Sequence, residues 1–306
     1  MHQAGANNEL REAIYRYASE RMDMNPAPLD GPKSRAELQA LAGSTITESG
    51  LGGARALEIF ERTLAPATIS TDHPNFLSFI PAAPTEAATL FDLVVSASSI
   101  YGGSWTEGAG AVFAENQVLE FLAKEAGLPD GAGGVFVQGG TLGNLSALVV
   151  ARDVAERKHG PKTWAIICSS EAHSSIKAVA KVMGVEVVKA DAAATGSLHG
   201  HQAKQAVHQA IESGLTPFAI VGTGGTTNFG IIDQLGELAL VAKEFDLWFH
   251  VDGAYGLAGM LVEELKPKYA GLELADSFIV DPHKWLFSPF DACALVYREP
   301  KLAKTA

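Results

Sequence analysis

The segment Asp281-Pro282-His283-Lys284-Trp285 places a lysine between a histidine and a tryptophan, directly after the apolar run at 277–280. In a crowded, partly dry site a lysine amine can be neutral, and the neutral amine can attack a carbonyl carbon and hold it as a Schiff base. Most lysines are solvated surface charges, and the pentapeptide alone is compatible with a plain strand cap. Lys284 is therefore a candidate covalent anchor that needs support from a second motif.

The second motif is Trp248-Phe249-His250-Val251-Asp252-Gly253-Ala254-Tyr255-Gly256, upstream of the first. An apolar strand here ends in an acid followed by small residues, as expected where a carboxylate meets a ligand at the carboxyl edge of a sheet. Asp252 at such an edge can pair with the protonated ring nitrogen of pyridoxal phosphate and keep the ring an electron sink. The two motifs together indicate a pyridoxal-phosphate site.

The motifs HVDGAYG and DPHKW, in this order and spacing, resemble those of the pyridoxal-phosphate-dependent group II amino-acid decarboxylases, the family of aromatic-amino-acid, histidine and glutamate decarboxylases. The resemblance covers the chain from about Leu51 onward. It implies decarboxylation of an L-amino acid to the amine and carbon dioxide through a Schiff base on Lys284, with Asp252 and His173 as the other catalytic residues. It leaves open another pyridoxal-phosphate lyase, or an aldehyde-forming enzyme, of the same fold.

A glycine-rich segment at 138–144 follows an apolar strand and opens a predicted helix. Glycines let backbone amides approach an anion, and a helix N-terminus attracts negative charge, so the segment suits a phosphate. A plain turn with a threonine cap explains the same residues equally well. The resemblance favours the phosphate and implies contacts from Thr141 and Leu142.

Two further strand ends carry polar residues. His173 follows the strand ending at Cys168, and the resemblance implies that its ring stacks on the pyridine ring of the cofactor. The segment Gly225-Thr226-Thr227 ends another strand, where Thr226 is expected to contact the cofactor; structural caps are the alternative for both segments. The remaining predicted cofactor contacts lie within the two motifs: Ala254, Asp281 and His283.

The substrate pocket is expected to have an apolar wall. The resemblance places Phe79, Ile80 and Trp105 in it, which favours an aromatic or hydrophobic substrate side chain. Glutamate is disfavoured because Ser78 and Phe79 stand where glutamate-specific members carry amide residues.

Composition excludes several classes of function. A net charge of −12 and the absence of a basic cluster argue against nucleic-acid binding, and no stretch is long and apolar enough for a membrane span or a signal peptide. The two cysteines, Cys168 and Cys293, lie in apolar runs and are expected to be packed thiols. The His250/Asp252 and His199/His201 pairs lack further ligands for a metal site. A cytoplasmic protein acting on a small molecule is predicted.

Short apolar β-branched runs alternate with helical patterns after residue 126, which predicts an α/β fold with a mostly parallel sheet between helices. The run at 292–297 follows 278–280 too closely for a helical crossover and is expected to pair antiparallel. The resemblance identifies residues 51–306 with the large domain of a fold-type I pyridoxal-phosphate enzyme and residues 1–50 with a helical arm. It also implies a homodimer. The family's C-terminal small domain has no counterpart in this sequence, so a truncated, non-catalytic remnant is a further alternative.

Overall fold

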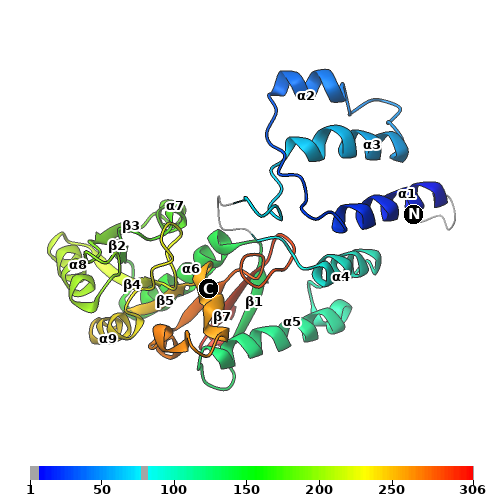
Figure 1. Ribbon diagram of the computed structural model, residues 1–306. Helices are drawn as coiled ribbons and strands as arrows, with labels where there is room; N and C mark the ends of the chain where they lie inside the picture. The colour runs from blue at the N-terminus through cyan, green and yellow to red at the C-terminus, as the bar shows by residue number, and fades with distance from the viewer. Residues whose placement is uncertain (1–6, 77–81, 306) are drawn as a thin grey trace. The chain divides into compact units, whose positions relative to one another are not determined.

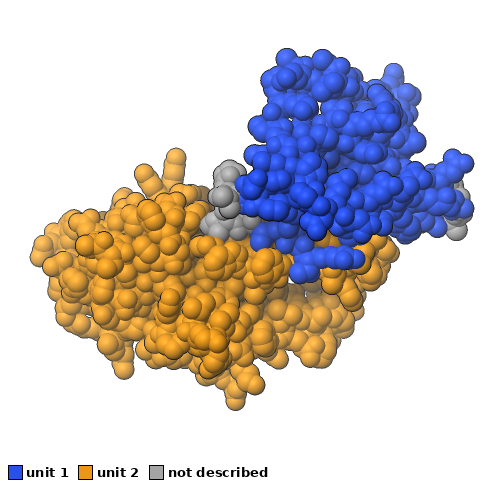
Figure 2. Space-filling model, viewed as in Figure 1, with its two compact units in different colours: residues 1–86 blue, residues 87–306 orange. Residues whose placement is uncertain are grey.

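The computed structural model describes residues 7–76 and 82–305. The chain divides into two compact units, residues 1–86 and residues 87–306, which Figure 2 shows in different colours. Phe79 and Ile80 lie outside the described residues.

Unit 1 is helical, as the amphipathic patterns predict. Ser34 caps its second helix in a capping box, since its hydroxyl accepts from the Glu37 amide at 3.3 Å and its own amide donates to the Glu37 carboxylate at 2.8 Å. Gly53 is the first residue of the third helix, and the end of the Leu10 side chain packs close to it. The helices are α1 (Asn8–Met22), α2 (Arg35–Ala42) and α3 (Gly53–Ile59), the last continuing as a π-helical turn over Phe60–Leu64.

Unit 2 contains a seven-stranded sheet in the order β1-β7-β6-β5-β4-β2-β3 (Figure 1). Strand β7 is antiparallel to both of its neighbours, as expected for the run at 292–297, and the pairs among the other five strands from β6 to β3 are parallel. The strands are β1 (Gly133–Val137), β2 (Trp164–Ser169), β3 (Glu186–Ala190), β4 (Thr216–Thr223), β5 (Trp248–Asp252), β6 (Ser277–Val280) and β7 (Cys293–Tyr297).

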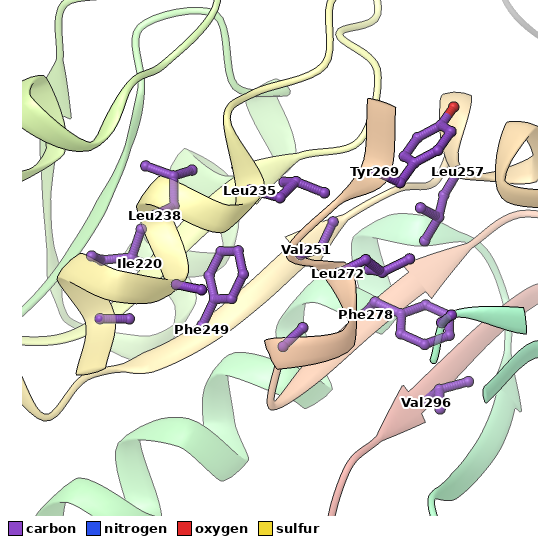
Figure 3. Packing of buried hydrophobic residues seen from close by; sticks show 14 of the residues in the cluster. Ile220, Leu235, Leu238, Phe249, Val251, Leu257, Tyr269, Leu272, Phe278 and Val296 are labelled. Carbon is purple, nitrogen blue, oxygen red and sulfur yellow. The ribbon is translucent and has the colours of Figure 1, made fainter. Parts of the chain in front are cut away.

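Helices cover both faces of this sheet, because successive side chains of each buried strand point to opposite sides. Ile220, Phe249, Phe278 and Val296, from four neighbouring strands, share one face in a single apolar cluster with residues of α5, α8 and α9 (Figure 3). A second cluster on the other face includes residues of α6 and α7. The unit's helices are α4 (Glu86–Ala97), α5 (Trp105–Glu125), α6 (Gly140–His159), α7 (Ser174–Met183), α8 (Gly200–Glu212) and α9 (Leu235–Phe245).

Glycines shape two of these helices. Helix α5 continues across a kink where Gly108 has non-helical φ and ψ of −127° and 32°. Helix α6 ends at His159, where Gly160 follows at φ 70° after three basic residues that suit the negative end of the helix dipole. Short 3₁₀ turns complete the fold at Ala65–Ala67, Gly256–Leu261, Lys266–Tyr269, Leu272–Leu274 and Pro300–Thr305.

Candidate active site

A pocket with about 430 Å³ of empty space, continuous with solvent, lies where strands of the sheet end. The carboxyl ends of β4 and β5, the turn after β6 and the N-terminal ends of α6 and α7 meet there, as expected for a ligand site of an α/β sheet. Six of the predicted site residues line it: Thr141, His173, Asp252, Ala254, Asp281 and Lys284.

Lys284 reaches the pocket through a tight turn. The Lys284 amide donates to the Asp281 carbonyl at 2.9 Å, and Pro282 occupies the second position of the turn, where its fixed φ is favourable. This turn brings the Lys284 ammonium to 2.9 Å from Asp281 Oδ2, with the lysine side chain 19% exposed and the aspartate side chain 2% exposed. The amine therefore lies inside the pocket, paired with a buried carboxylate.

Asp252 ends β5 as a fixed acceptor. Its Oδ1 accepts from the Ala254 amide at 3.2 Å, and its Oδ2 accepts from Asn144 Nδ2 at 2.9 Å. Asn144 belongs to α6 and is buried. The carboxylate is thus oriented by donors from the strand end and from a helix.

His250 lies two residues before Asp252 and therefore on the same face of β5. Its Nε2 is 2.9 Å from Asn144 Oδ1, and its Nδ1 is 2.8 Å from the Ser277 hydroxyl. Burial lowers the pKa of His250 to about 4, outweighing the negative charge of Asp252 and the backbone of Ser277, which favour the cation. His250 is therefore neutral near pH 7.

The N-terminus of α6 forms an anion cradle. Gly139 adopts φ 86°, which favours glycine, and Gly140 follows it at the pocket. A Cβ on Gly140 would come within 3.1 Å of the Ala254 Cβ and 3.3 Å of Asp281 Oδ2, so glycine keeps this wall open. The first amides of this 20-residue helix are available to a phosphate.

His173 is the N-cap residue of α7. Its Nδ1 accepts from the Ser175 amide at 3.2 Å and lies 2.9 Å from the Ser175 hydroxyl. The imidazole is exposed at the pocket and held at one nitrogen.

These residues fit pyridoxal phosphate: an amine, a fixed carboxylate, an exposed imidazole and an anion cradle share one pocket. Asp281 Oδ1 is, in addition, buried with no hydrogen-bond partner among the described residues, which leaves an acceptor for an incoming group.

The conserved domain of the pyridoxal-dependent decarboxylases matches residues 44–306. The chain belongs to the pyridoxal-dependent decarboxylase family. This membership confirms the resemblance drawn from HVDGAYG and DPHKW, and it confirms the cofactor prediction.

Known members of this family are similar over most of the chain. The aromatic-L-amino-acid decarboxylase of Bacillus atrophaeus is 32% identical over 265 residues, which are 85% of this chain and 55% of that protein. The 4-hydroxyphenylacetaldehyde synthase of Rhodiola rosea is 34% identical over 251 residues, 78% of this chain and 51% of that protein. The chain thus spans about half the length of these curated relatives.

Solved structures of the pyridoxal-dependent decarboxylases confirm the α/β fold. The crystal structure of the Rhodiola rosea synthase superposes with a TM-score of 0.86 at 29% identity, covering 96% of this chain and 66% of that one. The glutamate decarboxylase domain of a Vibrio parahaemolyticus diaminobutyrate-pyruvate transaminase and L-2,4-diaminobutyrate decarboxylase superposes at 0.89 and 28% identity, covering 99% and 70%.

Four of the predicted site residues do not line this pocket. Leu142 is 37% exposed on α6, and Trp105 is 58% exposed at the start of α5. The Thr226 hydroxyl is buried and accepts from the Ile231 amide at 3.2 Å, so it stabilises its own loop. The His283 ring is buried against Phe290, and its Nδ1 lies 2.8 Å from the Ala292 carbonyl oxygen.

The pocket also contains residues that the sequence analysis did not select. Asn144 lies one turn into α6, and Ser175 lies at the start of α7. Thr227, which follows Thr226 in the sequence, also lines the pocket. Tyr255 lines it too, with its ring 4.6 Å from that of Trp285, and burial raises the pKa of its hydroxyl. The sequence offered one signal for Asn144. Side chains alternate between the two faces of β5, so His250 and Asp252 share a face, and a helix packed on that face must supply their hydrogen-bond partner.

Within residues 7–76 and 82–305, no helix is both long and apolar enough to cross a membrane. Nor do histidine, cysteine, aspartate and glutamate side chains gather there in threes around a possible metal ion.

Proposed function

We propose that this chain carries the cofactor-binding part of a pyridoxal-phosphate-dependent decarboxylase for an L-amino acid with an aromatic or hydrophobic side chain. The observation that carries the proposal is the meeting of Lys284 and Asp252 in one pocket beside the N-terminus of α6. The name of the Bacillus atrophaeus relative supports the substrate class, whereas Trp105 does not line the pocket and Phe79 and Ile80 are not described.

Each side chain has a part in this proposal. Lys284 is the covalent anchor for the cofactor's aldehyde, the amides of Gly140 and Thr141 bind its phosphate, and Asp252 accepts from its ring N–H. When bound, pyridoxal phosphate supplies a ring that takes up the electrons released as the carboxylate departs. The N–H donors of Ala254 and Asn144 hold the Asp252 carboxyl group in one orientation, so that it can face the ring nitrogen.

His173 presents its exposed ring at the same pocket and is proposed to stack on the cofactor and position it. Asp281 holds the Lys284 ammonium before the cofactor enters.

A second candidate is aldehyde formation, which the 34% identity to the Rhodiola rosea synthase favours. Such an enzyme would use the same anchor and ring partner. The difference appears in the product, an aldehyde in place of an amine.

Cofactor capture tests the proposal. The purified chain is titrated with pyridoxal phosphate, its visible absorption recorded, the adduct reduced with borohydride and the labelled peptide mapped. We expect label on Lys284 and its loss in Lys284→Arg, with Lys189→Arg as the control, since Lys189 lines a separate cavity next to His173. No absorption band, or label on another lysine, would reject the site and favour a non-catalytic relative.

Product analysis then separates the candidates. The loaded protein is incubated with tyrosine, tryptophan, glutamate and 2,4-diaminobutyrate. Carbon dioxide with the amine from an aromatic substrate supports decarboxylation, and an aldehyde supports the alternative. Preference for glutamate or diaminobutyrate would overturn the substrate class.

We also propose that the chain forms a homodimer. Helix α4 supports this, because none of its residues is buried although it contains Leu90, Phe91, Leu93, Val94 and Val95. An apolar helix surface of this kind is typical of an interface.

A further inference from the structure

Buried side chains on one face of β5 and β6 form a continuous series of hydrogen bonds that ends at Asp252. Trp248 Nε1 donates to the Ser277 hydroxyl at 2.8 Å, and that hydroxyl lies 2.8 Å from His250 Nδ1. His250 Nε2 lies 2.9 Å from Asn144 Oδ1, and Asn144 Nδ2 donates to Asp252 Oδ2 at 2.9 Å. All five residues are buried.

The chemistry of the two ends gives this series one direction. An indole nitrogen only donates, and a carboxylate only accepts. Asn144 must therefore turn its NH₂ group toward Asp252, which turns its oxygen toward His250 and requires a proton on His250 Nε2. A neutral His250 then accepts at Nδ1, so the Ser277 hydroxyl donates to it while receiving the Trp248 N–H.

Asn144 divides the series into two branches. The second hydrogen of its NH₂ group goes to the Ser175 hydroxyl at 3.0 Å. That hydroxyl lies 2.9 Å from His173 Nδ1, which also accepts from the Ser175 amide at 3.2 Å. Since Nδ1 of His173 is an acceptor, a neutral His173 carries its proton on Nε2.

We propose that Trp248, Ser277, His250 and Asn144 are positioning residues that act as one directional relay, fixing Asp252 and, through Ser175, the tautomer of His173. The relay rests on the proposed function for its purpose, because those two residues are the proposed ring contacts of the cofactor. Its existence does not depend on that function, since every bond joins two groups of the chain itself.

The test reads ring protons directly. The full chain, labelled with ¹⁵N-histidine and free of cofactor, is studied by two-bond ¹H–¹⁵N correlation, with His250→Gln and His173→Gln used for assignment. We expect His250 as a single neutral tautomer with the proton on Nε2, and Nδ1 of neutral His173 as the acceptor. A proton on Nδ1 of His250 would overturn the relay.

Ser277→Ala removes one link without touching Asn144, Asp252 or His173. We expect the His250 Nδ1 signal to move because it loses its donor, and the His173 Nδ1 signal to shift although Ser277 does not contact that residue. Both rings keep the proton on Nε2, because Asp252 still orients Asn144. The matched control is Ser197→Ala, another buried serine, whose hydroxyl donates to the Ile232 carbonyl at 2.9 Å. Unchanged His173 signals in Ser277→Ala would show that the relay does not couple the two sites.

Trp248→Phe removes the donor at the start of the relay and keeps an aromatic ring. Its control is Trp164→Phe, also buried and also in edge contact with a second aromatic ring. We expect Trp248→Phe to move the His250 signals and weaken pyridoxal-phosphate binding about tenfold, and Trp164→Phe to do neither. If the His250 signals do not move, the relay is refuted, even if the cofactor binds. If the wild type shows the expected tautomers but does not bind the cofactor, only the proposed function is refuted.

Discussion

Asp252 and Asp281 are two carboxylates at one pocket with different partners. Asp252 accepts from two N–H groups, whereas Asp281 pairs with the Lys284 ammonium and keeps one oxygen without a hydrogen-bond partner among the described residues. Two N–H groups from the strand end and from α6 fix the orientation of Asp252, whereas the contact of Asp281 ends if the Lys284 amine moves away to bind another group. Asp252 is therefore suited to hold a fixed position, and Asp281 to take up a new partner.

Asn144→Asp should weaken cofactor binding, because it replaces the donor to Asp252 by a second carboxylate at hydrogen-bond distance. The new carboxylate cannot donate to Asp252 and repels it, so Asp252 loses the contact that orients it. We expect a loss of about 100-fold in pyridoxal-phosphate affinity, about 3 kcal/mol, measured by absorbance titration. Asn116→Asp, on the exposed side of α5, adds the same charge and should leave the affinity unchanged; equal losses would point to net charge as the cause.

His250 should make stability depend on pH. Its folded pKa of about 4 lies below the ordinary 6.5, so as pH falls the unfolded chain takes up the proton first and the folded state loses stability between pH 6.5 and 4. At about 1.4 kcal/mol per pH unit, the loss approaches about 3 kcal/mol. Urea unfolding of the wild type and His250→Gln across this range should show the difference between them shrinking as pH falls.

Asp233 contributes with the opposite sign, so this comparison needs the variant rather than the wild type alone. Burial raises the pKa of Asp233 to about 6, against hydrogen bonds from the Leu198 and Thr223 amides, and its contribution is therefore lost as pH rises from about 4 to 6. It cancels in the difference between wild type and His250→Gln. The exposed His208→Gln serves as the control, and a difference that does not vary with pH would refute a neutral, buried His250.

Helix α6 is the element that joins the parts of the site. Its first turn provides the anion cradle, its second residue Thr141 lines the pocket, and its fifth, Asn144, reaches Asp252. One face of this helix packs on β6 and β7. The distance between α6 and the sheet would therefore affect both the proposed contacts with the cofactor's phosphate and the position of Asp252 beside the cofactor's ring.

Gly143→Ala should push α6 off the sheet. A Cβ there would come within 2.9 Å of both Cys293 Sγ and Ile279 Cγ2, and both are fully buried. We expect a loss of about 1 to 3 kcal/mol in unfolding free energy, together with weaker cofactor binding. Gly110→Ala in α5 is the matched change, because no atom lies within 4 Å of the added Cβ; helix propensity should make it stabilising by up to about 1 kcal/mol. Chemical denaturation that shows the same sign for both would contradict this packing.

The sequence predicted the strands, their mostly parallel order and the antiparallel last run, because apolar periodicity and connection length are local properties. It also placed Asp252 at the end of a strand and Lys284 and His173 in segments that follow strands, and these three residues line one pocket. Their catalytic roles are proposals. Asn144 was missed because its role depends on which face of β5 packs against α6. That contact joins residues far apart in the sequence and has no local pattern. Thr226 was selected and Thr227 was not, because no local pattern tells which of two adjacent hydroxyls bonds within its own loop and which lines the pocket.

At the scale of the whole molecule, α4 predicts self-association. Phe91 is 70% exposed and Val94 is 55% exposed on this apolar helix. We expect a dimer in sedimentation velocity, with Phe91→Lys raising its dissociation constant at least tenfold by placing a charge in the interface. Leu240→Lys, on α9 and 64% exposed, adds the same charge and should leave the dimer intact. A monomeric wild type would refute the interface.

Strand β1 pairs only with β7 in the sheet order, and roughly 150 residues of chain lie between them. During synthesis at roughly 10 residues per second, β1 leaves the ribosome roughly 15 s before its partner does. Until then β6 also presents an open edge, because β7 lies between the two. The sheet is thus completed when β7 enters between β1 and β6, and the nascent chain must keep these two strand edges from pairing wrongly until β7 appears.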